Sequence, residues 1–160
     1  MLARRTLLIG GGTIGATVLA GCLSGSSDGE FTFERVVVSD QDPGEYDSYR
    51  DVPEERTHQV EDSVWLLVAV GNLPTDDDGT ASLEYTVQIA APDGSTLDPV
   101  IERSEQWDDV EGSDVLSVWE GFATYPEDST GEYEITVTVE DEFEGEQLRT
   151  EETFHLEEGD

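Results

Sequence analysis

A period of two in the alternation of apolar and polar residues most constrains what this chain can fold into. In the segment 131–140, acids and threonines alternate with apolar residues, namely Tyr133, Ile135, Val137 and Val139. Successive side chains of a strand point to opposite faces of its sheet, so this pattern predicts a strand with one buried face and one solvated face. The segment 81–91 alternates in the same way, and no segment of the chain shows a convincing helical period.

Five further segments carry strand patterns between turn residues, which gives about seven strands. They are residues 31–38, 57–73, 97–103, 115–125 and 147–156. Within the second of them, residues 64–70 are apolar on both faces. This run predicts a central strand that is buried on both sides, with Trp65 in the core. The acidic segment 40–55 is expected to be a long loop, whose Tyr46 and Tyr49 either cover the core or serve as exposed contact residues.

The segment Gly131–Ile135 resembles the late strand of immunoglobulin-like domains. In those domains a tyrosine near the start of the strand ties the adjoining corner, and Tyr133 would be that residue. Ile135 stands where antibody domains carry their second cysteine, so the resemblance implies no disulfide. Together with the turn spacing, it predicts an all-β, antiparallel immunoglobulin-like β-sandwich of about seven strands over residues 31–160.

Charge is the strongest global property of the chain. Asp and Glu number 39 against seven Arg and no Lys, for a net charge of −32. High net charge can indicate disorder, but the apolar residues here follow ordered strand patterns. Self-repulsion destabilises such a fold, and at about 1 M salt a Debye length of about 3 Å screens it. The balance resembles proteins of extreme halophiles, and it argues against nucleic acid or anionic lipid as a partner.

The first 22 residues resemble an export signal. Arg4 and Arg5 precede a weakly apolar, Gly-rich run, as in leaders of the Tat pathway. The run is shorter than the roughly 20 apolar residues that span a bilayer, which disfavours a transmembrane helix. We therefore expect residues 1–21 to be a signal peptide.

The segment Leu19–Cys22 resembles a lipobox, in which the cysteine thiol is joined to lipid and becomes the first residue of the mature chain. Cys22 is the chain's single cysteine, so no disulfide framework exists, and lipidation would explain an unpaired thiol in an exported protein. The alternative is a free thiol that is lost with the leader. Residues 22–30 would then form a flexible Gly/Ser tether between the lipid and the domain of residues 31–160.

Residues able to do chemistry are scarce. His58 and His155 are both expected at the surface, and no nucleophile elbow, phosphate loop or dinucleotide fingerprint occurs after the leader. Asp76, Asp77 and Asp78 are weak candidates for a calcium site, since clustered oxygens suit that ion. They do not match the twelve-residue calcium loop, and acidic clusters arise by chance in so acidic a chain. We expect no catalytic site, no resident metal and no cofactor.

The sequence therefore predicts a non-catalytic lipoprotein on the extracellular face of the cell membrane, tethered through Cys22. Its domain would be an interaction module for another surface or membrane protein. The alternative is a surface protein that binds a small ligand or calcium. A secreted enzyme ranks third, because it would require His58 or His155 to lie in a cleft beside a partner.

Overall fold

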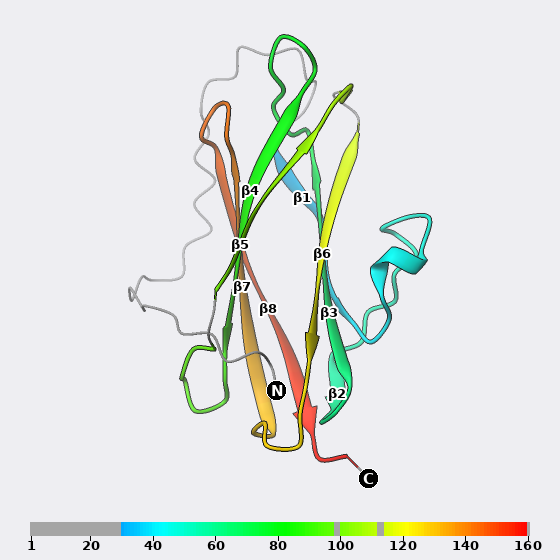
Figure 1. Ribbon diagram of the computed structural model, residues 1–160, viewed down its shortest axis with the longest axis vertical. Coiled ribbons are helices and arrows are strands. Elements are labelled where there is room, and N and C mark those ends of the chain that lie inside the picture. Colours follow the sequence, from blue (N-terminus) through cyan, green and yellow to red (C-terminus); the bar gives the residue numbers. More distant parts are fainter. Residues whose placement is uncertain (1–29, 98–99, 112–113, 160) are drawn as a thin grey trace.

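The computed structural model describes residues 30–97, 100–111 and 114–159, and these form an all-β body of two sheets (Figure 1). The described residues contain eight strands and one short 3₁₀ helix, η1. They are β1 (Thr32–Ser39), η1 (Pro43–Glu45), β2 (Thr57–Gln59), β3 (Ser63–Gly71), β4 (Ala81–Ala90), β5 (Ile101–Trp107), β6 (Val115–Ala123), β7 (Gly131–Asp141) and β8 (Gln147–Glu157). Within these residues, no helix is long and apolar enough to cross a membrane.

The two sheets have the strand orders β1-β3-β6 and β2-β8-β7-β4-β5. All neighbouring strands are antiparallel except β2 and β8, which are parallel. The prediction of a purely antiparallel arrangement was therefore wrong at this pair. The segment 57–73 is also not one strand. It divides into β2 and β3, which belong to different sheets, and this division raises the strand count to eight.

β3 is the centre of the three-stranded sheet and is buried on both faces, as the apolar run 64–70 predicted. Its inward residues Leu66, Val68 and Val70 belong to the main core. Leu67 belongs to a second cluster on the opposite face of the sheet. Trp65 shares that outward face and is only half-buried. Its predicted place in the core was wrong, because the alternation of β3 assigns the core to the even-numbered positions.

The inner face of the five-stranded sheet supplies most of the remaining core. The predicted inward residues of β4 and β7 are all buried, namely Leu83, Tyr85, Val87, Ile89, Tyr133, Ile135, Val137 and Val139. Phe154 and Leu156 of β8 join them. The ring of Phe154 stacks on Tyr133 with 5.0 Å between centroids. The two strands with the clearest period of two thus form the centre of their sheet.

Tyr133 also ties the corner before β7. Its hydroxyl donates a hydrogen bond of 2.7 Å to the carbonyl oxygen of Ser129, four residues upstream. Burial, together with the nearby carboxylates of Asp128 and Asp93, raises the pKa of Tyr133 to about 12. The hydroxyl therefore stays protonated and able to donate throughout the physiological range of pH.

Replacing Tyr133 with Phe keeps the stacked ring but removes the hydrogen bond to the corner. We expect the free energy of unfolding to fall by about 1–2 kcal/mol, because the carbonyl of Ser129 loses its partner. Denaturant unfolding in molar salt would measure the change. Tyr125→Phe, at a residue whose side chain is 44% exposed, is the matched control and should unfold like the unmodified protein. Equal free energies of unfolding for the two variants would contradict a stabilising role for the hydrogen bond from Tyr133 to Ser129.

Candidate functional site

The outer face of the three-stranded sheet is uncharged along β3 and β6, while its third strand, β1, brings Glu34 beside Gly71 and Arg35 to the loop 40–55. Along β3 and β6, the positions that alternate with core residues are all uncharged. They are Ser63, Trp65, Leu67, Ala69, Gly71, Val115, Ser117, Trp119, Gly121 and Ala123. In the five-stranded sheet, the outward positions of β4, β7 and β8 instead carry eight charged or titratable residues, namely Glu84, Glu132, Glu134, Glu140, Arg149, Glu151, His155 and Glu157.

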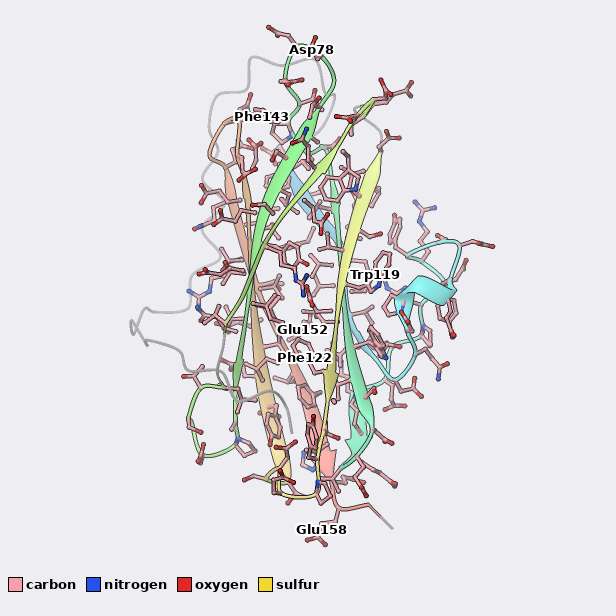
Figure 2. The ribbon with its side chains drawn as sticks, in the orientation of Figure 1. Asp78, Trp119, Phe122, Phe143, Glu152 and Glu158 are labelled. Carbon is pink, nitrogen blue, oxygen red and sulfur yellow. The ribbon has the colours of Figure 1, made fainter. Side chains whose placement is uncertain are left out.

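Two tryptophans dominate this uncharged surface. The side chain of Trp119 is 45% exposed and points away from the five-stranded sheet (Figure 2). Trp65 lies over Gly121 so closely that a β-carbon at Gly121 would be 2.7 Å from its ring. Gly121 is paired with Trp65 across the two strands, and its missing side chain leaves the space that the ring occupies. We call Trp65, Ser117, Trp119 and Gly121 the Trp face.

The loop 40–55 covers the neighbouring part of the same sheet, on the right of the view, and its Gly44 lies beside the Trp119 ring (Figure 1). Val52 packs there against Val37 and Leu67, with Tyr46 and Tyr49 packed around them. Arg35 fastens the loop by donating hydrogen bonds of 2.6 Å to the carbonyl oxygens of Tyr49 and Val52. Of the two alternatives for the tyrosines, that of covering residues is confirmed, over this second cluster rather than the main core.

A cluster of three polar side chains joins the two sheets behind the Trp face. The Glu120 carboxylate accepts a hydrogen bond of 2.6 Å from the Tyr85 hydroxyl and lies 2.6 Å from Nε of Arg103. These residues come from β6, β4 and β5. Burial raises the pKa of Tyr85 well above its usual value, and the hydrogen bond to Glu120 raises it further. The charge of Glu120, the one charged side chain of β6, is therefore neutralised by Arg103 and stabilised by the Tyr85 hydroxyl.

The two histidines lie in opposite environments. His155 is exposed, as predicted. His58 is only 1% exposed, so its prediction as a surface residue was wrong. The parallel pairing of β2 with β8 places it against Phe154, with 5.8 Å between the rings, and its Nε2 lies 2.8 Å from the carbonyl oxygen of Glu55. This contact requires Nε2 to donate, and it makes His58 a packed interior residue.

The acidic turn before β4 uses its oxygens internally. Oδ1 of Asp76 accepts hydrogen bonds of 2.9 Å from the backbone amides of Asp78 and Thr80. In the part of the chain that the structure describes, no three His, Cys, Asp or Glu side chains are grouped so as to hold a metal ion. Asp77 and Asp78 are exposed at the tip of this turn. Arg4, Arg5 and Cys22 lie outside the described residues.

Sequence reasoning placed Trp119 in a strand but did not identify it as an exposed residue. The signal was present in the alternation of β6. Leu116, Val118 and Phe122 contribute to the core, so a residue at position 119 must point outward.

No protein-family model matches the chain, and no curated protein matches it. Among solved structures, it is similar to the alkylpurine DNA glycosylase AlkC of Pseudomonas fluorescens, bound to DNA containing an abasic site analog. That match has a TM-score of 0.50 and 13% identity, and it covers 79% of this chain and 30% of the other. A family 123 glycoside hydrolase of Clostridium perfringens matches with a TM-score of 0.49 and 9% identity, over 78% of this chain and 27% of the other. The chain spans less than a third of either protein, and at these identities the first likeness concerns the fold alone.

The close approach of Trp65 to Gly121 predicts the effect of adding a methyl group there. Gly121→Ala should displace the Trp65 ring and lower the free energy of unfolding by about 1–3 kcal/mol, as overpacking does. Acrylamide quenching of tryptophan fluorescence should increase at the same time. Ser117→Ala, on the outward row of the same strand, is the control and should change neither quantity. A Gly121→Ala variant with unchanged quenching and stability would show that the ring does not depend on this glycine.

Proposed function

We propose that this protein is a non-catalytic cell-surface lipoprotein whose β-sandwich is an interaction module for another surface or membrane protein. The observation that carries the proposal is the uncharged, partly exposed Trp face in a chain with a net charge of −32. Elsewhere the outward positions carry acids that keep the surface solvated. Exposed Trp among uncharged neighbours is typical of contact surfaces, where aromatic side chains contribute much of the binding free energy.

The resemblance to immunoglobulin-like domains supports this proposal at the level of architecture. The neighbours β8, β7 and β4 would correspond to the strands G, F and C of such a domain, and β3 and β6 to B and E. The hydrogen bond from Tyr133 to Ser129 has the form of the tyrosine corner, and Ile135 occupies the position of the second cysteine. Sandwiches of this kind host many functions, so the assignment rests on the Trp face rather than on the fold.

The arrangement of the chain ends suits a tether at the N-terminus. Thr32 at the start of β1 pairs with Gly71 at the end of β3, and Asn72 donates a hydrogen bond of 3.1 Å to the carbonyl oxygen of Glu30. The described chain therefore enters at the end of the sandwich that carries Asp78 and Phe143, opposite Glu158 (Figure 2). A lipid at Cys22 would place this end toward the membrane and leave the Trp face on the side of the body, open to a neighbouring protein.

Anchoring through Cys22 predicts a simple change of location. Cys22→Ala should move the protein from the membrane fraction to the soluble fraction of its cells, because this variant lacks the thiol that the proposed lipid would be joined to. Fractionation in molar salt followed by immunoblotting measures the distribution. Ser24→Ala, two residues further along, should stay with the membranes. Retention of the Cys22→Ala chain in the membrane fraction would contradict lipid anchoring at this residue.

Binding through the Trp face predicts loss of a captured partner when its exposed ring is removed. Trp119→Thr keeps a strand-forming residue, and we expect cross-linking pull-down from native membranes in molar salt to lose the partner at least tenfold. Phe143→Ser removes an aromatic side chain of similar exposure, 44%, from a distant turn and should leave capture unchanged. Equal capture by both variants would exclude the Trp face as the binding surface, and no captured protein at all would contradict the proposed function.

A further inference from the structure

The edges of the two sheets are protected against pairing at every strand except β6. An unpaired strand edge is a template for another strand, and proteins block it with charges, bulges, short strands or covering segments. β2 is only three residues long, and it covers residues 155–157 of β8. The rest of the β8 edge carries Arg149, Glu151 and Glu152, while β5 carries Glu102, Arg103 and Glu105.

The edge strand β1 has two protections. Its pairing with β3 is interrupted by a register shift between Phe33 and Arg35, as a bulge produces. Further along, the backbone amide of Glu55 donates a hydrogen bond of 2.9 Å to the carbonyl oxygen of Val38, so the loop 40–55 occupies part of this edge. Each feature removes a stretch of regular unpaired backbone from this edge, and so makes pairing with another strand harder.

β6 has none of these protections. It is nine residues long, lacks proline, and pairs with β3 without any register shift. Among the described residues, its backbone is paired with β3 alone. Its one charged residue, Glu120, points inward and is met by Arg103 and Tyr85. A long, regular and uncharged row of free backbone groups therefore lines this edge, beside the exposed ring of Trp119 (Figure 2).

We propose that β6 pairs with β6 of a second copy of this chain, antiparallel and centred on Trp119. Two-fold symmetry brings the same surface of both copies together, and Trp119 is the middle residue of Val115–Ala123. Ser117 then faces Gly121 of the second copy, and Val115 faces its Ala123. The product is a continuous six-stranded sheet with the order β1-β3-β6-β6-β3-β1, whose two Trp faces lie on one side.

Charge selects a second copy over a cationic partner. A basic segment would gain most on the acidic surfaces and least beside this uncharged row. The two paired β6 strands would place no like charges opposite each other, and such charges would oppose strand pairing. The long-range repulsion between two acidic bodies is screened in molar salt, where the Debye length is about 3 Å. The inference concerns the edge of β6 and does not depend on whether the Trp face binds another protein.

The test uses the full chain with Cys22→Ser, which leaves no cysteine and no site for the lipid. Sedimentation equilibrium at micromolar concentration in molar salt should give twice the 17.5 kDa mass of one chain. A monomer at every accessible concentration would overturn the proposal. The monomeric result would leave the proposed function standing if Trp119→Thr still loses the captured partner, so the two failures are distinguishable.

Single cysteines in the same background test the register. Trp119→Cys should form an intermolecular disulfide under mild oxidation, because opposed residues of antiparallel strands have α-carbons about 4.5–5.5 Å apart, within disulfide range. Ser117→Cys should remain at least tenfold less cross-linked, since it faces Gly121 and lies four residues from its own counterpart. Cross-linking of both variants to the same extent, or of Ser117→Cys alone, would overturn the pairing centred on Trp119. Circular dichroism of each variant confirms that the fold is retained.

Discussion

Burial of β3 on both faces is the constraint on which the rest of this structure depends. Its inward residues pack against the five-stranded sheet, so the two sheets share one core. Its outward Leu67 needs a second cover, which the loop 40–55 provides through Val52 and the tyrosines. Trp65 shares this outward face and lies against Gly121 of β6. Gly44 of the same loop lies beside the Trp119 ring, which nevertheless stays 45% exposed, so the chain's own loop leaves the Trp face partly uncovered.

The distribution of acids follows from the same constraint. A chain with 39 acidic residues must keep them solvated and apart, and the outer face of the five-stranded sheet and the turns accept most of them. The buried carboxylate of Asp141 is stabilised by hydrogen-bond donors. Asp141 is buried, accepts hydrogen bonds from the amides of Phe143 and Glu144, and has its pKa raised by burial. Uncharged outward positions on β3 and β6 therefore stand out as a property of that sheet.

The Trp face and the edge of β6 meet at Trp119, and together they suggest one use of the surface. Pairing of two β6 edges would bring two Trp faces into a single continuous face. Such a surface would be larger and more apolar than either alone, which suits a partner that is itself paired or repeated.

The alternation along the sequence determined which segments become strands and, for β4, β7 and β8, which side chains enter the core. It also contained the outward direction of Trp119, since Leu116, Val118 and Phe122 set the phase of β6. Period two gives each strand two faces, but it does not say which partner covers them. Three features depend on contacts between distant segments. They are the separation of β2 from β3, the burial of His58 against Phe154 of β8, and the position of Trp65 over Gly121. Only the tertiary structure could decide these, because the physical cause of each lies in a neighbour that local sequence does not specify.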